Sequence, residues 1–431
     1  MFRLTLTELR AGLARRLAPA ASLDAVGLAV SGGADSLALL LLAAEWARQI
    51  ATPPKLIVYS VDHGLRPEAA AEAAFVAEIA TRLGFAARAL RWAGDKPLVG
   101  VQAAARTARY RLMGEAMRAD GAKLLLTAHH LGDQAETVLM RLAHGSGLEG
   151  LRGMDAVAEV EGVPVFRPLL DVAPELLREL VAEAGLVPVS DPSNFDGHYE
   201  RVRWRQALPQ LVALGVTPER LFDFAQRAGD ADEALAQWAD ERFEALVRLD
   251  RLGAAQLSHP ELARLPRAVA TRLLARLLDV AGGGQKPRAL GAVERLHARI
   301  LGENIFTGVT TLGTKVARRG ETLWFAREPG RQPIGPATIA PAETLLWDGR
   351  FRIANRSPRL AIQVHMAEGF SRARVEQLVG GSVAAPAAAI RSAPLVTRAD
   401  GAVLAFGCYR LDDDIEVELS RSHNAGNVTA N

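Results

Sequence analysis

The sequence predicts an α/β protein: a doubly wound, mainly parallel sheet, followed by a helical domain and a small strand-rich C-terminal domain. Short apolar runs alternate with helical patterns over the first half of the chain, which is typical of a parallel sheet covered on both faces. A glycine-rich turn joins the first of these strands to a long apolar helix. Beyond about Thr217 the pattern becomes helical and then strand-rich. We therefore expect domains at 1–216, 217–328 and 342–431.

The first domain is organised around the turn between an apolar strand, Val26–Val30, and an almost wholly apolar helix, Leu37–Ile50. Such a turn directs free backbone N–H groups at one spot, and the helix dipole adds positive potential there. Glycines within it allow a phosphate to approach the backbone closely. We therefore predict a phosphate cradle made by Ser31, Gly32, Gly33, Ala34, Asp35 and Ser36. The alternative is a plain turn in which Asp35 or Ser36 caps the helix.

Further strands and helices follow in alternation. The predicted strands are 56–62, 85–92, 123–130 and 165–170, and the predicted helices are 67–83, 101–119, 133–143 and 174–184. Ligands of such sheets lie beyond the carboxyl ends of the strands. Ser31, His63 and His129 all fall at those ends, so we expect the site there. Later in the chain, 306–327 is predicted to form a hairpin that turns at Arg319-Gly320, and 329–341 a linker.

Composition limits the possible functions. Lys and Arg number 51 against 49 Asp and Glu, so the overall charge of +2 does not indicate a nucleic-acid partner. One cysteine, Cys408, excludes a disulfide within the chain and any site built from several cysteines. No apolar run approaches the length of a membrane span. We interpret Met1–Ala20 as an amphipathic helix rather than a transit peptide, and expect a soluble cytoplasmic protein.

A second informative stretch is His129–Thr137, which leaves a predicted strand and enters a helix. Asp133 and Glu136 are three residues apart and so share one helix face. With Asp133 as the N-cap and Glu136 at N3, the pattern is close to a capping box. A metal site is also open, since His129 and Asp133 are four apart, but Mg²⁺ prefers carboxylate and phosphate oxygens to imidazole. From these residues alone, the cap is favoured.

Both stretches resemble known motifs. Ser31–Ser36 resembles the S-G-G-x-D-S loop of the PP-loop ATP pyrophosphatases, and His129–Thr137 resembles the H-H-x-x-D-Q-x-E-T motif of their tRNA(Ile)-lysidine synthetase branch. Other similar segments are Val61–Arg66, the A-R-x-x-R-Y pattern with Arg106, Arg109 and Tyr110, Gly145–Met154, Arg167–Leu170, Asp191–Asn194 and Thr311–Glu328. The chain departs from the family pattern at Val202, which follows Arg201, and at Pro174, which stands near a usual arginine.

The resemblance implies a reaction. ATP adenylates the wobble cytidine of a tRNA(Ile) with a CAU anticodon, and pyrophosphate leaves. The ε-amine of free L-lysine then attacks the activated carbon and expels AMP. The cradle would bind the pyrophosphate and Asp35 would position Mg²⁺. Arg106 would contact phosphate or the activated base, and His63 would lie beside the nucleotide. Asp133 and Glu136 would hold the lysine ammonium, and one of them could take its proton.

A basic stretch further along suits the tRNA partner. Arg201, Arg203, Trp204 and Arg205 interleave charge with an aromatic ring, which is typical of RNA contacts, although a solvated helix face would look the same. A homodimer remains possible. Two other functions stay open: a PP-loop tRNA thiolase, which the single cysteine disfavours, and a tRNA-binding protein without catalysis. The presence of Asp35, Asp133 and Glu136 argues against the latter.

Overall fold

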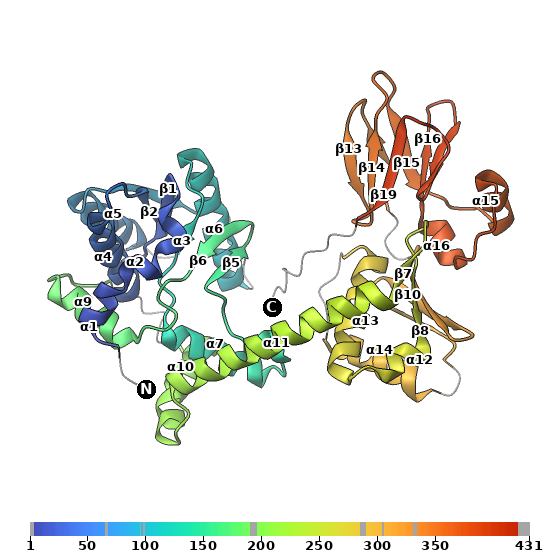
Figure 1. Cartoon of the computed structure of the whole chain (residues 1–431). Helices are drawn as coiled ribbons and strands as arrows, with labels where there is room; N and C mark the ends of the chain where they lie inside the picture. Colours follow the sequence, from blue (N-terminus) through green and yellow to red (C-terminus); the bar gives the residue numbers. More distant parts are fainter. Residues whose placement is uncertain are drawn as a thin grey trace. The chain divides into compact units, whose positions relative to one another are not determined.

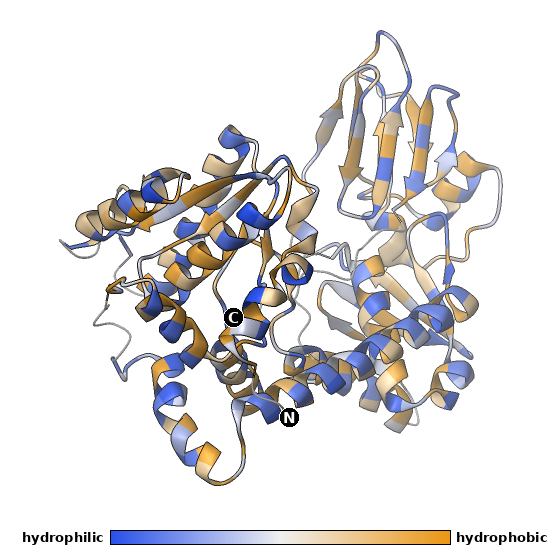
Figure 2. Cartoon of the chain, turned by 60° about the vertical axis from the view of Figure 1, so that its left-hand side comes forward, coloured by the Kyte–Doolittle hydropathy of each residue, from blue (hydrophilic) through white to orange (hydrophobic). Residues whose placement is uncertain are grey.

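The computed structural model describes residues 4–64, 68–94, 96–97, 100–189, 196–284, 290–303, 306–330 and 334–420. The chain divides into two compact units, Met1–Ala231 and Asp232–Asn431 (Figure 1). In both units hydrophobic residues gather along the strands, whereas many helices alternate hydrophobic and hydrophilic residues (Figure 2). Within the described ranges, no helix combines the length and the apolar character needed to cross a membrane.

The first unit is built on a six-stranded sheet of order β3-β2-β1-β4-β6-β5. Its strands are β1 (Ala25–Ala29), β2 (Lys55–Asp62), β3 (Ala86–Arg91), β4 (Leu125–Leu126), β5 (Val157–Val160) and β6 (Val163–Phe166). Only β5 is antiparallel to its neighbour, so the prediction of a mainly parallel sheet is confirmed. β5 was not predicted. A turn at Glu161 and Gly162, both with positive φ, joins it to β6. β4 is shorter than the predicted 123–130, and His130 pairs with Leu169 only as an isolated bridge.

Helices cover both faces of this sheet. The helices of this unit are α1 (Leu6–Ala11), α2 (Leu13–Arg16), α3 (Ala18–Ala21), α4 (Ala34–Gln49), α5 (Ala69–Arg82), α6 (Val101–Asp120), α7 (Leu131–Ala143), α8 (Leu148–Leu151), α9 (Pro174–Glu183), α10 (Glu200–Ala213) and the start of α11 (Pro218–Leu246). Val26 and Leu28 of β1 pack in the core with α4, α5 and α9. Ala25 and Ala29 face the other way and pack with α6. This alternation is the physical basis of the predicted double winding.

The N-terminal segment is folded onto this core. The interpretation of Met1–Ala20 as a packed amphipathic segment is confirmed for its described part, although three short helices replace one long helix. Its buried leucines share the core of α4 and α9; they are Leu6, Leu9, Leu13 and Leu17. Thr5 begins α1 with a capping box, in which its side chain accepts from Glu8 N and the Glu8 carboxylate accepts from Thr5 N.

The second unit begins with helices against a five-stranded antiparallel sheet of order β7-β8-β11-β10-β9. The strands are β7 (Arg248–Leu249), β8 (Ala255–Ser258), β9 (Val309–Thr311), β10 (Thr314–Arg319) and β11 (Thr322–Arg327), and the helices are the end of α11, α12 (His259–Arg264), α13 (Arg267–Gly282) and α14 (Leu290–Gly302). The predicted hairpin turning at Arg319-Gly320 is confirmed. The expected helical domain also contains two short strands that were not predicted, β7 and β8. These strands were missed because they are short and gain their pairing from β11, far along the chain.

The rest of the second unit contains two further sheets, of order β12-β15-β16-β17-β18 and β13-β14-β19. Their elements are β12 (Ala337–Ile339), β13 (Thr344–Trp347), β14 (Phe351–Asn355), β15 (Ile362–Met366), α15 (Arg372–Val379), α16 (Ala387–Ser392), β16 (Pro394–Thr397), β17 (Val403–Phe406), β18 (Tyr409–Arg410) and β19 (Ile415–Leu419). The strand-rich character is confirmed. The expected linker 329–341 is not only linker, since β12 pairs with β15.

A buried ion cluster joins the two halves of this second unit. Asp348 Oδ2 accepts from Arg350 Nε at 2.7 Å and lies 3.3 Å from Arg327 Nε of β11. All three side chains are almost completely buried. One hydrophobic core also runs from β11 to α16 and β17. The two halves therefore pack as parts of one body, and the three domain boundaries expected from the sequence stay a prediction.

Candidate active site

The glycine turn lies where the sequence predicts it, between β1 and α4. Gly33 occupies the N-cap of α4, and no side chain caps the helix. The Ser36 hydroxyl donates to Gly33 O at 2.9 Å and accepts from Ser31 N at 3.2 Å, so it closes the turn on itself. The alternative of a helix capped by Asp35 or Ser36 is therefore wrong. No described side chain caps the first N–H groups of α4, and an uncapped helix N-terminus of this kind can receive an anion.

The two glycines of this turn differ in what they allow. Gly32 has φ +85° and lies close to the side chain of Val189, 3.0 Å from where a Cβ would stand. Gly32 O also accepts from Val189 N at 2.9 Å. Gly33 has an ordinary φ of −70°, and a Cβ there would meet only Ser31 Oγ, at 3.9 Å. Gly32 thus serves the backbone of the turn, whereas Gly33 leaves open space beside the free N–H groups.

His130 connects the cradle to α7. Its Nε2 lies 3.5 Å from Asp35 Oδ2 and 3.6 Å from Asp133 Oδ2. His130 is also the N-cap of α7, since its Nδ1 accepts from Asp133 N and its N–H donates to Asp133 Oδ2. The capping box is thus His130 with Asp133 at N3, and the expected Asp133 and Glu136 pairing is wrong by one helical turn. Burial lowers the pKa of His130, but Asp35, Asp133 and Glu136 together raise it above its ordinary value.

Asp133 and Glu136, the predicted lysine-binding carboxylates, lie against two arginines of α10. Arg201 Nε donates to Glu136 Oε2 at 2.7 Å, and its NH2 donates to Asp133 Oδ1 at 3.1 Å. Arg205 Nε donates to Glu136 Oε1 at 2.7 Å. Glu136 is buried. Each of its carboxylate oxygens accepts a hydrogen bond from a guanidinium group, and these groups neutralise its charge. The structure therefore brings two predicted sites together, because Arg201 and Arg205 were expected to face RNA.

The other two residues of that basic stretch point elsewhere on α10. Arg203 is exposed and donates to the backbone carbonyls of Gly197 and His198. Trp204 is partly buried against the core formed by α7 and α11 and donates from Nε1 to Glu200 at 3.3 Å. The side chains of this stretch thus point in turn to the acidic pair of α7, to solvent and to the core. Neighbouring helical residues point about 100° apart, so they cannot form one face.

The remaining predicted residues also lie at the carboxyl edge of the sheet or on α6. His63 follows β2 and meets Trp92 edge-on, with ring centroids 6.3 Å apart. Arg106 is exposed on α6, with its guanidinium 5.2 Å from the centre of the buried Tyr110 ring. His129 accepts or donates a hydrogen bond at 2.9 Å between Nδ1 and Thr127 Oγ1. The family-like residues Leu65 and Arg66 and the segment Asp191–Asn194 lie outside the described residues.

The sequence motif contains a residue whose role was missed. Gln134 is buried and holds both backbone groups of Met154, accepting from its N at 2.7 Å and donating to its O at 2.9 Å. Gly153 has φ +74°, and a Cβ there would stand 2.7 Å from Gln134. Arg141 donates to the carbonyls of Gly150 and Gly153. Side chains of α7 therefore hold the glycine loop that follows this helix. The sequence signal for this role is Gln134, a polar residue on an otherwise apolar face of the helix.

Mg²⁺ fits this site if it is held by one carboxylate together with phosphate oxygens of the substrate. Among the described residues, no group of three or more His, Cys, Asp or Glu side chains could hold a metal ion. Mg²⁺ commonly uses one or two carboxylates together with substrate phosphate oxygens. The partly exposed Asp35 carboxylate beside the free N–H groups of the cradle suits that mode.

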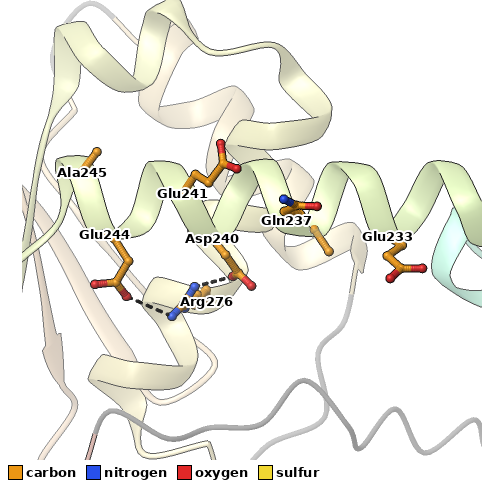
Figure 3. A pocket seen from close by; sticks show the side chains of 8 residues that line it. Glu233, Gln237, Asp240, Glu241, Glu244, Ala245 and Arg276 are labelled. Atoms are coloured by element: carbon orange, nitrogen blue, oxygen red, sulfur yellow. Dashed lines mark hydrogen bonds and ion pairs between the residues drawn. The ribbon is translucent and has the colours of Figure 1, made fainter.

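A groove of about 980 Å³ lies in the second unit along α11 and contains none of the predicted residues (Figure 3). Its charged lining is mostly acidic, with Glu233, Asp240, Glu241 and Glu244. Arg276 reaches two of these carboxylates, those of Asp240 and Glu244. An acidic groove repels phosphate groups, so it does not compete with the cradle as a nucleotide site.

Comparison with known proteins shows which family the chain resembles. A family model described as a PP-loop domain matches residues 7–212. The tRNA(Ile)-lysidine synthase of Bradyrhizobium sp. strain BTAi1 is 42% identical over 314 residues, which cover 71% of this chain and 86% of that protein. The same enzyme of Rhodopseudomonas palustris is 46% identical over 63% of this chain and 79% of its own length. That of Methylobacterium nodulans is 44% identical over 74% and 95%. The chain therefore belongs to the tRNA(Ile)-lysidine synthase family.

Proposed function

We propose that this protein ligates free L-lysine to the wobble cytidine of a tRNA(Ile) with a CAU anticodon, consuming ATP and releasing pyrophosphate and AMP. The observation that carries the proposal is that the predicted phosphate cradle and the acidic pair of α7 lie close together. His130 contacts both, with its Nε2 3.5 Å from Asp35 and 3.6 Å from Asp133. A two-step ligase needs its nucleotide and its nucleophile within one site, because the activated base is attacked where it forms.

The cradle serves the first step. Free N–H groups at the start of α4 would bind the β and γ phosphates as they become pyrophosphate. The open space beside Gly33 allows a phosphate to come close to the backbone. Mg²⁺, held by Asp35 and phosphate oxygens, would neutralise negative charge there. The base oxygen of cytidine displaces pyrophosphate and takes the AMP group. Arg106 and His63 are proposed to contact the nucleotide or the activated base.

Asp133 and Glu136 serve the second step. The lysine ammonium would bind these carboxylates and lose a proton to one of them before it attacks. Both already bind Arg201 and Arg205, so the ammonium must take over part of these hydrogen bonds. Asp133 also has both oxygens engaged, Oδ1 by Arg201 and Oδ2 by the backbone N–H of His130, so either carboxylate must exchange a partner before it accepts the proton. AMP leaves as the new carbon–nitrogen bond forms.

The tRNA would reach the site as a single-stranded anticodon loop. Its target base is already unpaired, so presenting it costs less than flipping a base from a duplex. Of the four predicted contacts, Arg201, Arg203, Trp204 and Arg205, the exposed Arg203 is the best placed for a backbone phosphate, because Arg201 and Arg205 bind Glu136 and Trp204 packs towards the core. A cytoplasmic location and a homodimer belong to the proposal as well; light scattering of the purified protein tests the dimer.

The thiolase alternative has no support in the structure. Sulfur transfer requires a reactive thiol, and burial raises the pKa of Cys408, the single cysteine, to about 12. The thiol is therefore protonated and unreactive near neutral pH.

The test supplies ATP, radiolabelled lysine and tRNA with a CAU anticodon. Lysine should enter the RNA with AMP as coproduct, and Asp35→Asn should abolish pyrophosphate release while tRNA binding persists. A tRNA whose wobble cytidine is replaced is the control and should take up no label. Release of ADP, or attachment of label to the 3′ end of the tRNA, would contradict the proposal.

A further inference from the structure

The acidic pair of α7 is closed to a further cation by the partners that it already has. Each of its four carboxylate oxygens accepts a hydrogen bond: Asp133 Oδ1 and Glu136 Oε2 from Arg201, Glu136 Oε1 from Arg205, and Asp133 Oδ2 from the backbone N–H of His130. The two carboxylates and the two guanidinium groups also cancel in charge. A lysine ammonium that joined this cluster would be a third cation beside two anions, which like-charge repulsion opposes.

We infer that Arg201 and Arg205 form a latch, which occupies the acidic pair until phosphate groups of the tRNA draw the two guanidinium groups away. Lysine then meets carboxylates whose oxygens are free. This inference rests on the proposed function and adds a regulation of its lysine site, because lysine binds well only after the tRNA has bound.

The exposure of the latch residues permits such an exchange. Arg201 and Arg205 are four residues apart and so share one face of α10. Their side chains are 38% and 46% exposed, whereas that of Glu136 is only 3% exposed. An ion pair with a partly exposed member contributes little to stability, since water screens it. The arginines therefore change partner at a small cost, while the buried carboxylate stays in place.

The body of α10 is anchored, so the exchange needs only the arginine side chains and one turn of the helix. Val202 is buried, and Trp204 packs on the core that α7 and α11 share with this helix. Pro209 lies inside α10 and has no N–H, so the helix lacks the hydrogen bond that Arg205 O would otherwise accept. The turn that carries Arg205 is thus held by one hydrogen bond fewer than an ordinary helical turn.

RNA supplies the competing anion. Arg203 is exposed on the same helix and donates to the backbone carbonyls of Gly197 and His198, so it has no carboxylate to leave when a phosphate arrives. A phosphate bound there brings the RNA backbone to α10. Guanidinium groups form two parallel hydrogen bonds with phosphate as they do with carboxylate, so the RNA can replace the acidic pair as the partner of the latch.

The two ligands therefore favour the same arrangement of the site. The tRNA binds better when Arg201 and Arg205 are released, and lysine binds better when Asp133 and Glu136 are open. Ligands that prefer the same state tighten each other's binding by the same factor. Such coupling is typically about 5- to 150-fold.

The experiment measures lysine affinity in the full-length protein without ATP, so that no reaction occurs. Equilibrium dialysis with radiolabelled lysine is carried out with and without saturating tRNA with a CAU anticodon. In the wild type, tRNA should tighten lysine binding about 5- to 150-fold. Arg205→Gln should bind lysine more tightly than the wild type when tRNA is absent, and tRNA should then add less than about threefold. Arg111→Gln, at an exposed ion pair of α6, is the matched control and should keep the wild-type dependence on tRNA.

The outcomes separate the latch from a purely structural role and from the proposed function. If Arg205 only neutralises Glu136, its loss changes lysine affinity equally with and without tRNA, so an unchanged dependence on tRNA in Arg205→Gln would overturn the latch. Equal lysine affinity of the wild type with and without tRNA would overturn it as well, and that measurement needs no variant to fold. Wild-type protein that incorporates no lysine when ATP is added would refute the proposed function instead. Circular dichroism and unfolding temperature check that both variants fold.

Discussion

Adjacent residues of one type can have different constraints, as Gly32 and Gly33 of the cradle show. Gly32 is required by its own backbone, because its φ is +85° and Val189 packs against it. Gly33 has a φ that any residue adopts, with open space beside it. The first glycine is therefore needed for folding, and the second is free to serve the ligand that we predict there.

Alanine at each glycine separates these roles. Gly32→Ala should destabilise the protein by about 1–3 kcal/mol, because a side chain at positive φ is strained and Val189 must shift. Gly33→Ala should leave the free energy of unfolding within about 0.5 kcal/mol, because the new Cβ meets only Ser31 Oγ, at an ordinary contact distance of 3.9 Å. It should nevertheless raise the KM for ATP at least tenfold. Denaturant unfolding and pyrophosphate release measure the two effects, and an unchanged KM in Gly33→Ala would show that phosphate does not approach there.

Glu136 offers a second test at the residue scale. Glu136→Gln leaves Arg201 and Arg205 facing a neutral amide. We expect a loss of about 1–2 kcal/mol, less than for a fully buried pair because both arginines are more than one third exposed. Lysine transfer should fall at least 100-fold while pyrophosphate release continues. Glu115→Gln, which removes an exposed ion pair on α6, is the control and should alter neither. Equal loss of both steps would argue against a lysine-binding role.

At the scale of elements, α7 does more than present its carboxylates. Through Gln134 and Arg141 it holds the glycine loop that follows it. Asp133, Gln134 and Glu136 lie within one turn, so one helix orients the acidic pair on one side and the loop on another. His130 sets where this helix begins.

Gln134→Leu should release the glycine loop. The N–H and C=O of Met154 lose their partners, so we expect the protein to lose about 2–4 kcal/mol of stability. Limited proteolysis should show new cleavage within 145–154, and the unfolding temperature should fall. Gln102→Leu, at an exposed position on α6, provides the comparison and should change neither. Wild-type resistance to protease in Gln134→Leu would mean that other contacts hold the loop.

At the scale of the whole molecule, each unit has its own hydrophobic cores, and a cluster of buried ions connects parts of the second unit. Asp348 neutralises Arg327 and Arg350, which come from different parts of the unit. Arg350 also donates to Ser392 O, which brings in the end of α16. Removing the central carboxylate leaves two buried cations without a counter-charge.

Asp348→Ala should therefore destabilise the second unit by about 3–5 kcal/mol. Because the chain forms two compact units, calorimetry should show the transition of the second unit at a lower temperature and that of the first unchanged. Asp413→Ala, at an exposed carboxylate, is the control. A shift of both transitions together would mean that the two units unfold cooperatively.

Cys408 provides a chemical probe of the same unit. Burial, with a smaller contribution from Asp250, raises the pKa of its thiol from 9.0 to about 12. The reactive thiolate is the deprotonated form, so at pH 8 its fraction falls about 1,000-fold relative to a thiol of ordinary pKa. Iodoacetamide should alkylate the native protein very slowly and the urea-unfolded protein rapidly, and the native rate should rise with pH. Equal rates in both states would contradict this environment.

Much of the fold could be predicted, because its signals are local. Apolar runs, helix stops and the glycine turn depend on neighbours within a few residues, so the strand and helix order of the first unit and the Arg319-Gly320 hairpin were recoverable. β5, β7 and β8 were not, because each is only two to four residues long and exists through a partner strand. The capping box was misplaced by one turn, since Asp133 fits two positions and only the backbone geometry chooses between them.

By itself, the sequence determined the turn at Ser31–Ser36 and the family resemblance, and it predicted the phosphate cradle and the acidic pair of α7, since each depends on a short stretch whose chemistry follows from residue type and spacing. Only the tertiary structure decided what these groups face. Arg201 and Arg205 reach Glu136 across more than sixty residues of chain. Such pairings depend on how α7 and α10 pack, because side chains distant in sequence meet only when the hydrophobic cores bring their elements together.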